Sequence, residues 1–508
     1  MTVLLWVLLL VLVVAYWASL KIGIKKHPDL PAEEGKKVIL IVVDSLLSEP
    51  LESLMAQNKV PAFSFLKEKG SYSNRMVSSF PTMSVTIDST LLTGTYPDKH
   101  RIPGLRWYSL KEKRLIHYGD GVFPTIKSGI KTVMNDGLFH LNNTHLSTQT
   151  RTIHEELAVS GRSTASINAI VYRSNHMKDL AIPWPFSKIQ TKAPDYFVLG
   201  NFYRYMSSGF FPFINYYGVN NRVSIQHLVR MIRKDQLPSF TVVYLADLDH
   251  ESHKQGELSS ESVVQVDRQL QEVFHAFGKW DEGLEKCVFM VMGDSGVSRI
   301  KNDKKEAIVD LDQTFSKMRV APLGSSGPTD EMALAVNERM SYIYPLQDQV
   351  ELQAMVKELK HDERLDLISW KDKDWVKVMQ GGSGKEMRFR KGNTFVDEYH
   401  QQWDIEGDME VLDLKRAPKE EAIGYGSYPD GLMRLYAALH SHEGKFLLVT
   451  IQPGYEMKGT GSPTHVGGGS HGGLHEVDSY FPIFIAGTKE RPTYNRIVDL
   501  KDFILRQM

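Results

Sequence analysis

The chain has 508 residues, of which 42% are hydrophobic and 24% are charged, an ordinary balance for a globular protein. This length allows one large domain with an insertion, or two modest domains. The formal net charge of -1 gives no general attraction to nucleic acid, so we expect no binding to nucleic-acid duplexes. An acidic substrate would have to be bound by a local site.

The amino-terminal segment is apolar. Residues 3–20 contain no charged side chain, and lysines follow at positions 21, 25 and 26. A helix of about 18 apolar residues just spans a hydrocarbon core of roughly 30 Å. A signal peptide would begin with a positive segment and end in a small-residue cleavage site, and neither is present. We therefore expect residues 1–20 to be a single-pass transmembrane helix that anchors the chain in the lipid bilayer of the cell membrane.

Apolar, β-branched runs recur after a short linker, which we place at residues 21–37. Such runs suit strands that are buried on both faces of a parallel sheet. Helical patterns separate them, as over residues 152–160, where Gly161 ends the pattern. The alternation predicts an α/β/α sandwich with a mostly parallel, doubly wound sheet. The runs are Val38–Val43, Thr164–Ile170, Thr241–Ala246, Val288–Met292, Phe446–Ile451 and Phe481–Ala486.

The sequence changes in character between residues 331 and 425. Charge density rises there, and an alternating segment, Met387–Lys391, follows a glycine-rich loop. This predicts a smaller α+β insertion, so that the core occupies residues 38–330 and 426–508. The single cysteine, Cys287, cannot form an internal disulfide, and its apolar surroundings predict a small buried hydrophobe.

Three of the predicted strands end in aspartate, at Asp44, Asp249 and Asp294. One aspartate at a strand end is most often a helix N-cap. Parallel strands, however, bring their carboxyl ends to one edge of the sheet, where ligands bind. Three carboxylates meeting there would repel one another unless a cation neutralised them. The pattern therefore favours a metal site.

Two histidines strengthen this interpretation. His253 follows Asp249 by four residues, close enough for both to bind one ion. His471 lies in the run Gly-Gly-Gly-Ser-His-Gly-Gly, and so much glycine indicates that the backbone approaches a ligand closely. A lone histidine in a loop is usually unremarkable, but one in this setting is a candidate metal ligand.

A segment rich in hydroxyl groups, residues 80–100, contains the motif Leu-Thr-Gly-x-Tyr-Pro-x-x-His. With a hydroxyl residue ten positions before its glycine, the segment resembles the nucleophile helix of the alkaline phosphatase superfamily. The branch it resembles most is the type I phosphodiesterase / nucleotide pyrophosphatase family. Counting back from Gly94 under this resemblance identifies Ser84 as the nucleophile, with Thr82 and Thr86 as alternatives.

The resemblance also implies a fold of alkaline phosphatase type and two divalent metal ions. Zinc is implied, and the oxygen and nitrogen ligands also suit manganese or magnesium. One ion would be bound by Asp44, Ser84 and Asp294. The other would be bound by Asp249, His253 and His471.

The chain departs from the family pattern at two positions. The family has Asp-His-Gly after the third strand, whereas this chain has Ser295 after Asp294. Ser295 itself, His465 or His475 could complete that metal site. The family also has an asparagine that binds a phosphoryl oxygen shortly after the Tyr-Pro-x-x-His segment, and Arg106 could take this part.

The resemblance implies hydrolysis of phosphate esters, expected to be phosphodiesters or nucleotide pyrophosphates, through a covalent phosphoseryl intermediate. Three alternatives stay open: a phosphoryl-group transferase acting on lipid or glycan alcohols, a sulfatase-like hydrolase, and a membrane-tethered binding protein with a degraded site. The x-Pro-x-Arg motif of sulfatases is missing after Ser84. Lysines only after the anchor favour a cytoplasmic catalytic domain, whereas the resemblance favours an extracytoplasmic one.

Overall fold

The structure is a computed structural model. It describes residues 24–30, 33–119, 122–182, 189–205, 219–324, 326–416, 421–459 and 461–508. The expected membrane anchor at residues 3–20 lies outside these ranges. Across the part of the chain that is described, no helix combines the length and the apolar composition needed to cross a bilayer.

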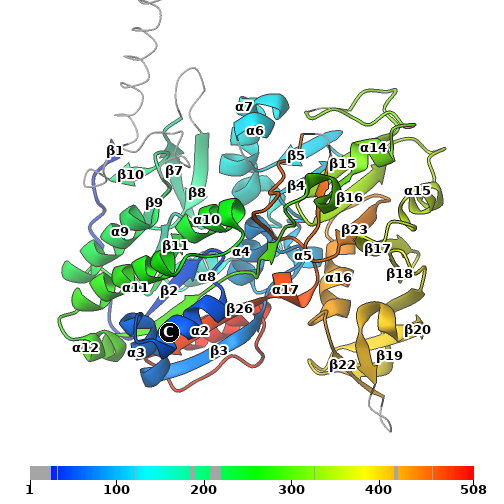
Figure 1. The fold of residues 1–508 in the computed structure, drawn as a ribbon. Helices are drawn as coiled ribbons and strands as arrows, with labels where there is room; N and C mark the ends of the chain where they lie inside the picture. The colour runs from blue at the N-terminus through cyan, green and yellow to red at the C-terminus, as the bar shows by residue number, and fades with distance from the viewer. Residues whose placement is uncertain are drawn as a thin grey trace, which may run out of the picture.

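The first of two large sheets contains seven strands (Figure 1). Its central strands β12, β2, β11, β6 and β9 are parallel, while β26 runs antiparallel to both β12 and β3. The predicted, mostly parallel sheet is therefore present. In spatial order its strands are β3 (Gly70–Val77), β26 (Tyr480–Ala486), β12 (Cys287–Met292), β2 (Lys37–Val43), β11 (Phe240–Leu245), β6 (Thr164–Ile167) and β9 (Tyr196–Val198).

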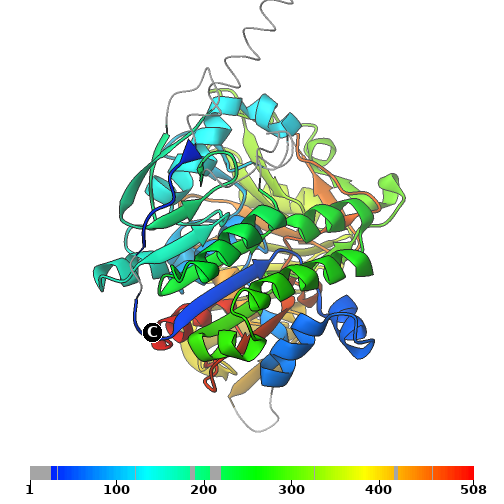
Figure 2. The same cartoon turned by 90° about the vertical axis from the view of Figure 1, so that its left-hand side faces the viewer.

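Helices cover both faces of this sheet, as Figures 1 and 2 show. Alternate residues of β2 enter two separate hydrophobic clusters, with Val38, Leu40 and Val42 on one side and Ile39 and Ile41 on the other. The first cluster includes α4 (Ser84–Thr93), α8 (Ile153–Val159) and α18 (Leu500–Arg506). The second includes α2 (Ser48–Ala56), α3 (Pro61–Lys69), α9 (Asn221–Arg233) and α11 (Ser260–His275).

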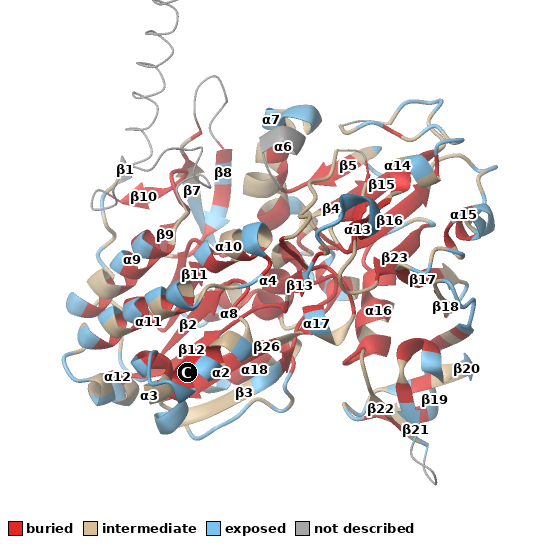
Figure 3. Cartoon of the chain, viewed as in Figure 1, coloured by how far each residue is buried: buried red, intermediate tan, exposed pale blue. Residues whose placement is uncertain are grey.

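Burial on both faces explains why the strands are continuously apolar. All six residues of β11 and all six of β12 are buried (Figure 3). They include Cys287, which packs as a small hydrophobe. The helix predicted at residues 152–160 is α8. Thr152 and Glu155 form a capping box at its start, and Gly161 follows its end with φ +71°.

A second, nine-stranded sheet is built mostly from residues 332–425. The predicted strand Phe446–Ile451 belongs to this sheet and not to the first one, which corrects the sequence analysis. It forms β23 (Leu447–Ile451) between β16 and β17, antiparallel to both. The strands of the sheet are β15 (Met332–Asn337), β16 (Met340–Pro345), β23, β17 (Leu365–Asp372), β18 (Trp375–Gln380), β19 (Glu386–Asp397), β22 (Ala422–Tyr425) and β21 (Leu414–Arg416), with β20 (Gln402–Gly407) paired to β19.

The pattern was misleading because β23 is also covered on both faces. Leu447 and Val449 pack in a cluster with α15 (Leu352–Leu359). Leu448 packs in the main cluster with α16 (Gly431–Leu439). A two-sided antiparallel strand therefore has the same continuous apolar run as a buried parallel strand.

The segment before β2, which the sequence predicted to be a linker, is docked on the core. Glu33 accepts hydrogen bonds from the backbone N–H of Ser163 at 2.7 Å and from the hydroxyl groups of Ser163 and Ser239. Ser239 immediately precedes β11 and Ser163 immediately precedes β6, so one carboxylate joins the amino ends of two strands. His27 stacks on Tyr205 with ring centroids 4.7 Å apart.

We predict that Glu33→Ala lowers the free energy of unfolding by about 1–2 kcal/mol, because it leaves three half-buried donors without their acceptor. Chemical denaturation measures the change. The matched control is Glu34→Ala, since the Glu34 side chain is exposed and only its carbonyl accepts a hydrogen bond, from Lys37. Equal effects of the two substitutions would show that Glu33 does not fasten this segment.

Candidate metal centre and active site

The three aspartates of the predicted cluster follow neighbouring strands. Asp44 comes directly after β2, Asp294 follows β12 after one glycine, and Asp249 lies in the first turn of α10 (Asp247–Gln255) after β11. The register pairs Val43 with Leu245, and Val42 with Met292. The three strands therefore end level with one another, at the same edge of the sheet.

Ser45 joins two of these aspartates directly. Its backbone N–H donates to Asp294 Oδ1 at 3.0 Å, and its hydroxyl donates to Asp249 Oδ1 at 2.9 Å. Asp44 precedes Ser45 in the chain, and its Oδ2 accepts a hydrogen bond from the hydroxyl of Tyr244. The structure thus brings the three carboxylates together, as the strand-end pattern predicted.

The electrostatics of Asp44 and Asp294 are those of crowded anions. Burial, and then the charges of Asp294 and Asp249, raise the pKa of Asp44 well above its usual range. Burial likewise raises the pKa of Asp294 to about 6, although the N–H of Ser45 opposes the shift. A divalent cation between the two carboxylates would relieve this repulsion, so the donor set fits a metal ion.

Asp249, His253 and His471 form a compact group of side chains that could hold a metal ion. Asp249 Oδ1 lies 3.3 Å from His253 Nε2 and 3.6 Å from His471 Nε2. One ligand atom from each of the three residues lies within 4.8 Å of the others. One carboxylate oxygen and two imidazole nitrogens are a donor set that suits zinc.

Both imidazoles are oriented by hydrogen bonds from their other nitrogen. His253 Nδ1 lies 2.9 Å from the carbonyl oxygen of Gly469, and His471 Nδ1 lies 2.6 Å from that of Thr82. A carbonyl oxygen can only accept, so each Nδ1 carries the proton, and the lone pair of the neutral ring is on Nε2, beside Asp249. Fixing the ring through its second nitrogen is typical of metal-binding histidines.

The charges within this group are strongly coupled. Burial opposes the ionisation of Asp249, yet the neighbouring His253 and His471 hold its pKa well below its usual range. Burial also disfavours protonated imidazole, but Asp249 and Glu338 raise the pKa of His253 well above its usual range. Glu338 and Asp249 similarly raise the pKa of His471 to about 9. The pocket thus favours positive charge between its carboxylates.

The glycines before His471 allow the loop to pack directly against a neighbouring helix. A Cβ on Gly468 would lie 2.0 Å from the carbonyl oxygen of His253, and one on Gly469 would lie 2.8 Å from that of Ser252. Both carbonyl groups belong to α10, so glycine lets the loop lie directly against this helix. The close approach that we expected toward a ligand is thus made toward the helix that carries Asp249 and His253.

Ser84 begins α4, next to this loop. It is partly exposed, while every later residue of α4 is buried. Two residues earlier, Thr82 contacts the loop through its carbonyl oxygen, which lies beside His471, and its hydroxyl, which accepts from Gly472 N–H at 2.7 Å. Thr86 is fully buried, and its hydroxyl donates to the carbonyl oxygen of Ile102. The alternatives Thr82 and Thr86 thus have structural partners.

The structure also places the other predicted site residues. His465 stacks on His253, with ring centroids 4.3 Å apart, on the side of the Asp249 group and not beside Asp44. His475 is the N-cap of α17 (Glu476–Ser479). Ser295 is buried next to Asp294. Arg106 is buried on β4 (Arg106–Ser109), where its backbone pairs with the side chain of Asn337.

The sequence analysis missed Glu338. This residue lies in the turn between β15 and β16, and its Oε1 is 3.8 Å from His253 Nε2. It also forms a group of possible metal ligands with His253 and His465. Glu338 is one of 61 acidic residues and follows none of the strands that the sequence predicted, so no signal in the sequence separated it from the others.

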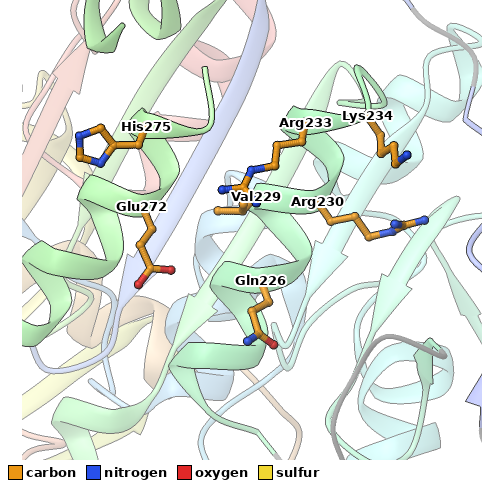
Figure 4. A pocket seen from close by; sticks show the side chains of 7 residues that line it. All are labelled: Gln226, Val229, Arg230, Arg233, Lys234, Glu272 and His275. Atoms are coloured by element: carbon orange, nitrogen blue, oxygen red, sulfur yellow. The ribbon is translucent and has the colours of Figure 1, made fainter. Parts of the chain in front are cut away.

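A groove of about 470 Å³ lies elsewhere, between α9 and α11. Figure 4 shows its basic and acidic side chains along the two helices. Asn221, at the start of α9, donates its N–H to Asp247 near the sheet edge where the three aspartates lie, and α9 then runs toward the start of β11. Arg230 and Arg233 therefore lie near the amino ends of the strands, opposite the three aspartates.

Comparison with protein families matches residues 38–418 to the family described as type I phosphodiesterase / nucleotide pyrophosphatase. The chain belongs to this family. It is therefore a hydrolase, and its family supports phosphodiester hydrolysis as the reaction. Comparison with curated proteins gives no match.

Solved structures with the same fold include murine ectonucleotide pyrophosphatase / phosphodiesterase 5 (TM-score 0.54, 14% identity, covering 93% of this chain and 94% of that one). An inactive variant of the murine protein in complex with AMP gives the same TM-score and identity, over 93% and 95% of the two chains. The human protein gives a TM-score of 0.54 at 12% identity, over 93% and 94%. At these identities the similarity concerns the fold.

We predict that Gly468→Ala lowers the affinity of the phosphodiesterase for Zn²⁺ about tenfold or more, because the added Cβ displaces the loop that carries His471 from α10. Isothermal titration calorimetry measures the affinity. Gly424→Ala is the matched control, since no atom lies within 4 Å of the position of its Cβ. Unchanged affinity in Gly468→Ala would mean that close contact of the loop with α10 does not position the ligands.

Proposed function

We propose that this chain hydrolyses phosphodiesters or nucleotide pyrophosphates with Ser84 as the nucleophile, at a site that holds two divalent cations. The observation that carries the proposal is the position of Ser84. It is the one residue of α4 that is not buried, and the segment before it contacts the loop of His471. A hydroxyl there is accessible to substrate and adjacent to the proposed ligands.

Asp44, Ser84 and Asp294 would hold one cation, and Asp249, His253 and His471 would hold the other. We propose zinc for both positions, from the family resemblance and the mixed oxygen and nitrogen donors. Divalent cations supply charge stabilisation for an in-line phosphoryl displacement and increase the acidity of a bound hydroxyl group. Ser295 contributes a hydroxyl where the family has an imidazole, so the first position should bind its cation less tightly than the second.

The protein's own groups would then act in a defined order. Ser84 Oγ attacks phosphorus, the bond to the leaving group breaks, and water later cleaves the phosphoserine. The amino end of α4 favours an anionic phosphoryl group, because its first backbone N–H groups lack intrahelical partners. Arg106 is our candidate for binding a phosphoryl oxygen.

The family supports a phosphate-ester or nucleotide substrate. The inactive murine protein binds AMP, so we propose that one side of the scissile phosphate in this chain's substrate is a nucleoside. A transferase would share attack by Ser84 and would pass the phosphoryl group to an alcohol instead of water. A sulfatase-like enzyme or a binding protein with a degraded site would not turn over a phosphodiester.

We predict that Ser84→Ala lowers kcat by about 10⁴-fold or more, because the covalent step loses its nucleophile. A chromogenic nucleotide phosphodiester measures the rate, and circular dichroism checks the fold. Thr86→Ala is the matched control, since its hydroxyl is committed to Ile102. Loss of turnover in Thr82→Ala, with full activity in Ser84→Ala, would show that Thr82 and not Ser84 is the nucleophile.

A panel of substrates tests the reaction class. The wild-type chain, depleted of metal and reloaded with Zn²⁺, Mn²⁺ or Mg²⁺, is given a nucleotide phosphodiester, a phosphomonoester and a sulfate ester. We expect the phosphodiester to be cleaved fastest. Preferred cleavage of the sulfate ester, or product formation only with an added alcohol, would contradict hydrolysis of phosphodiesters.

We further propose that residues 3–20 anchor the enzyme in the cell membrane, because the segment is apolar on all sides and carries no cleavage signal. The full chain is expected in the membrane fraction and released by detergent but not by high salt or carbonate. A chain beginning at Ile24 keeps the docked segment and should be soluble and active. Recovery of the full chain in the soluble fraction would contradict the anchor.

A further inference from the structure

Glu338 and His465 extend the group Asp249, His253 and His471 beyond the ligands that the family pattern supplied. His253 belongs to two overlapping groups of possible metal ligands, one with Asp249 and His471 and the other with Glu338 and His465. Nδ1 of His253 lies beside the carbonyl oxygen of Gly469, so Nε2 is its free ligand atom. One imidazole nitrogen binds one cation in the plane of its ring. The two groups can therefore both be used only if they share one cation.

His465 is oriented as a metal ligand would be. Its Nδ1 lies 2.8 Å from Glu456 Oε1, and its backbone N–H donates to Glu456 Oε2 at 2.6 Å. Glu456 is fully buried, and its Oε1 also lies 2.9 Å from Ser470 Oγ. A carboxylate on Nδ1 directs the other nitrogen of the ring outward and makes it more basic, as in carboxylate–histidine–metal arrangements.

Glu338 is held in an uncommon conformation. Its φ of +57° falls in the left-handed region, where glycine and asparagine are usual in a two-residue hairpin turn. Its Oε2 accepts from Ser470 Oγ at 2.8 Å and from His471 N–H at 3.2 Å. Oε1 is thereby turned toward His253, at 3.8 Å. A strained backbone that aims one carboxylate oxygen into a histidine cluster suggests a functional reason for glutamate there.

We propose that Glu338 and His465 are ligands of the cation held by Asp249, His253 and His471, so that this position has five protein ligands. The proposal rests on the metal position assigned under the proposed function. A crowded ligand set leaves little room for substrate or water on that cation. Substrate would then reach the centre through the more open position at Asp44 and Asp294, where Ser295 replaces the imidazole of the family.

The test measures metal binding, not turnover. Asp44→Asn in all proteins weakens the first position, so that titration of the metal-free full chain with Zn²⁺ or Co²⁺ reports on the second. In this background, His465→Ala and Glu338→Gln are each expected to lower Zn²⁺ affinity about 100-fold. A loss of this size equals or exceeds the largest loss expected for a residue that only orients a metal ligand. His475→Ala is the matched control, because it removes a nearby histidine that caps α17.

Visible spectra of the Co²⁺ forms separate ligands from positioning residues, since the absorption bands strengthen as the coordination number falls. The background protein should give weak bands, and both variants stronger ones. Added imidazole should restore the weak bands in His465→Ala. Glu338→Gln keeps the side-chain shape, and thermal unfolding of the metal-free proteins verifies folding.

An affinity within about twofold of the background, or a tenfold loss with an unchanged Co²⁺ spectrum, would overturn the assignment of ligands. Failure of the proposed function has a different signature. If the proposed function is wrong, Ser84→Ala would keep its turnover, whatever the Co²⁺ spectra show. The two hypotheses can therefore fail separately.

Discussion

Repulsion among buried carboxylates is the main constraint on the edge of the first sheet where its parallel strands end. Asp44, Asp249 and Asp294 converge because β2, β11 and β12 end level with one another. His253 and His471 lie beside Asp249 and hold its pKa below its usual range, whereas Asp44 and Asp294 receive hydrogen bonds from the neutral groups of Tyr244 and Ser45. The second pair therefore has the most to gain from a divalent cation, even though it offers the poorer ligand set.

Much of this edge of the sheet could be predicted from sequence, because local patterns determine it. A continuous apolar run followed by aspartate specifies both a buried strand and the side chain at its end, as at Asp44 and Asp294. The four-residue spacing of Asp249 and His253 places both on one face of α10. Gly161 identified the end of α8 in the same way.

What could not be predicted depends on contacts between distant parts of the chain. The apolar run at β23 has the same pattern whether a strand lies in the first sheet or in the second, because both are covered on two faces. Glu338 joins the histidines only because the β15–β16 turn folds back onto the loop before His471. The glycines near His471 indicated a close approach, but sequence could not tell a ligand from the backbone of α10.

A metal ion bound partly by Glu338 would also affect the stability of the structure. Asp249 and His253 lie on α10, which follows the first sheet, whereas Glu338 lies in a turn of the second sheet, and His471 lies in the loop between them. A cation bound by all of these residues joins the two sheets. Binding at 100 times Kd would then add about 2.7 kcal/mol to the stability of the bound arrangement. Because Thr82, two residues before Ser84, contacts the same loop, a cation that joined the sheets would also fix the distance of the proposed nucleophile from the proposed ligands.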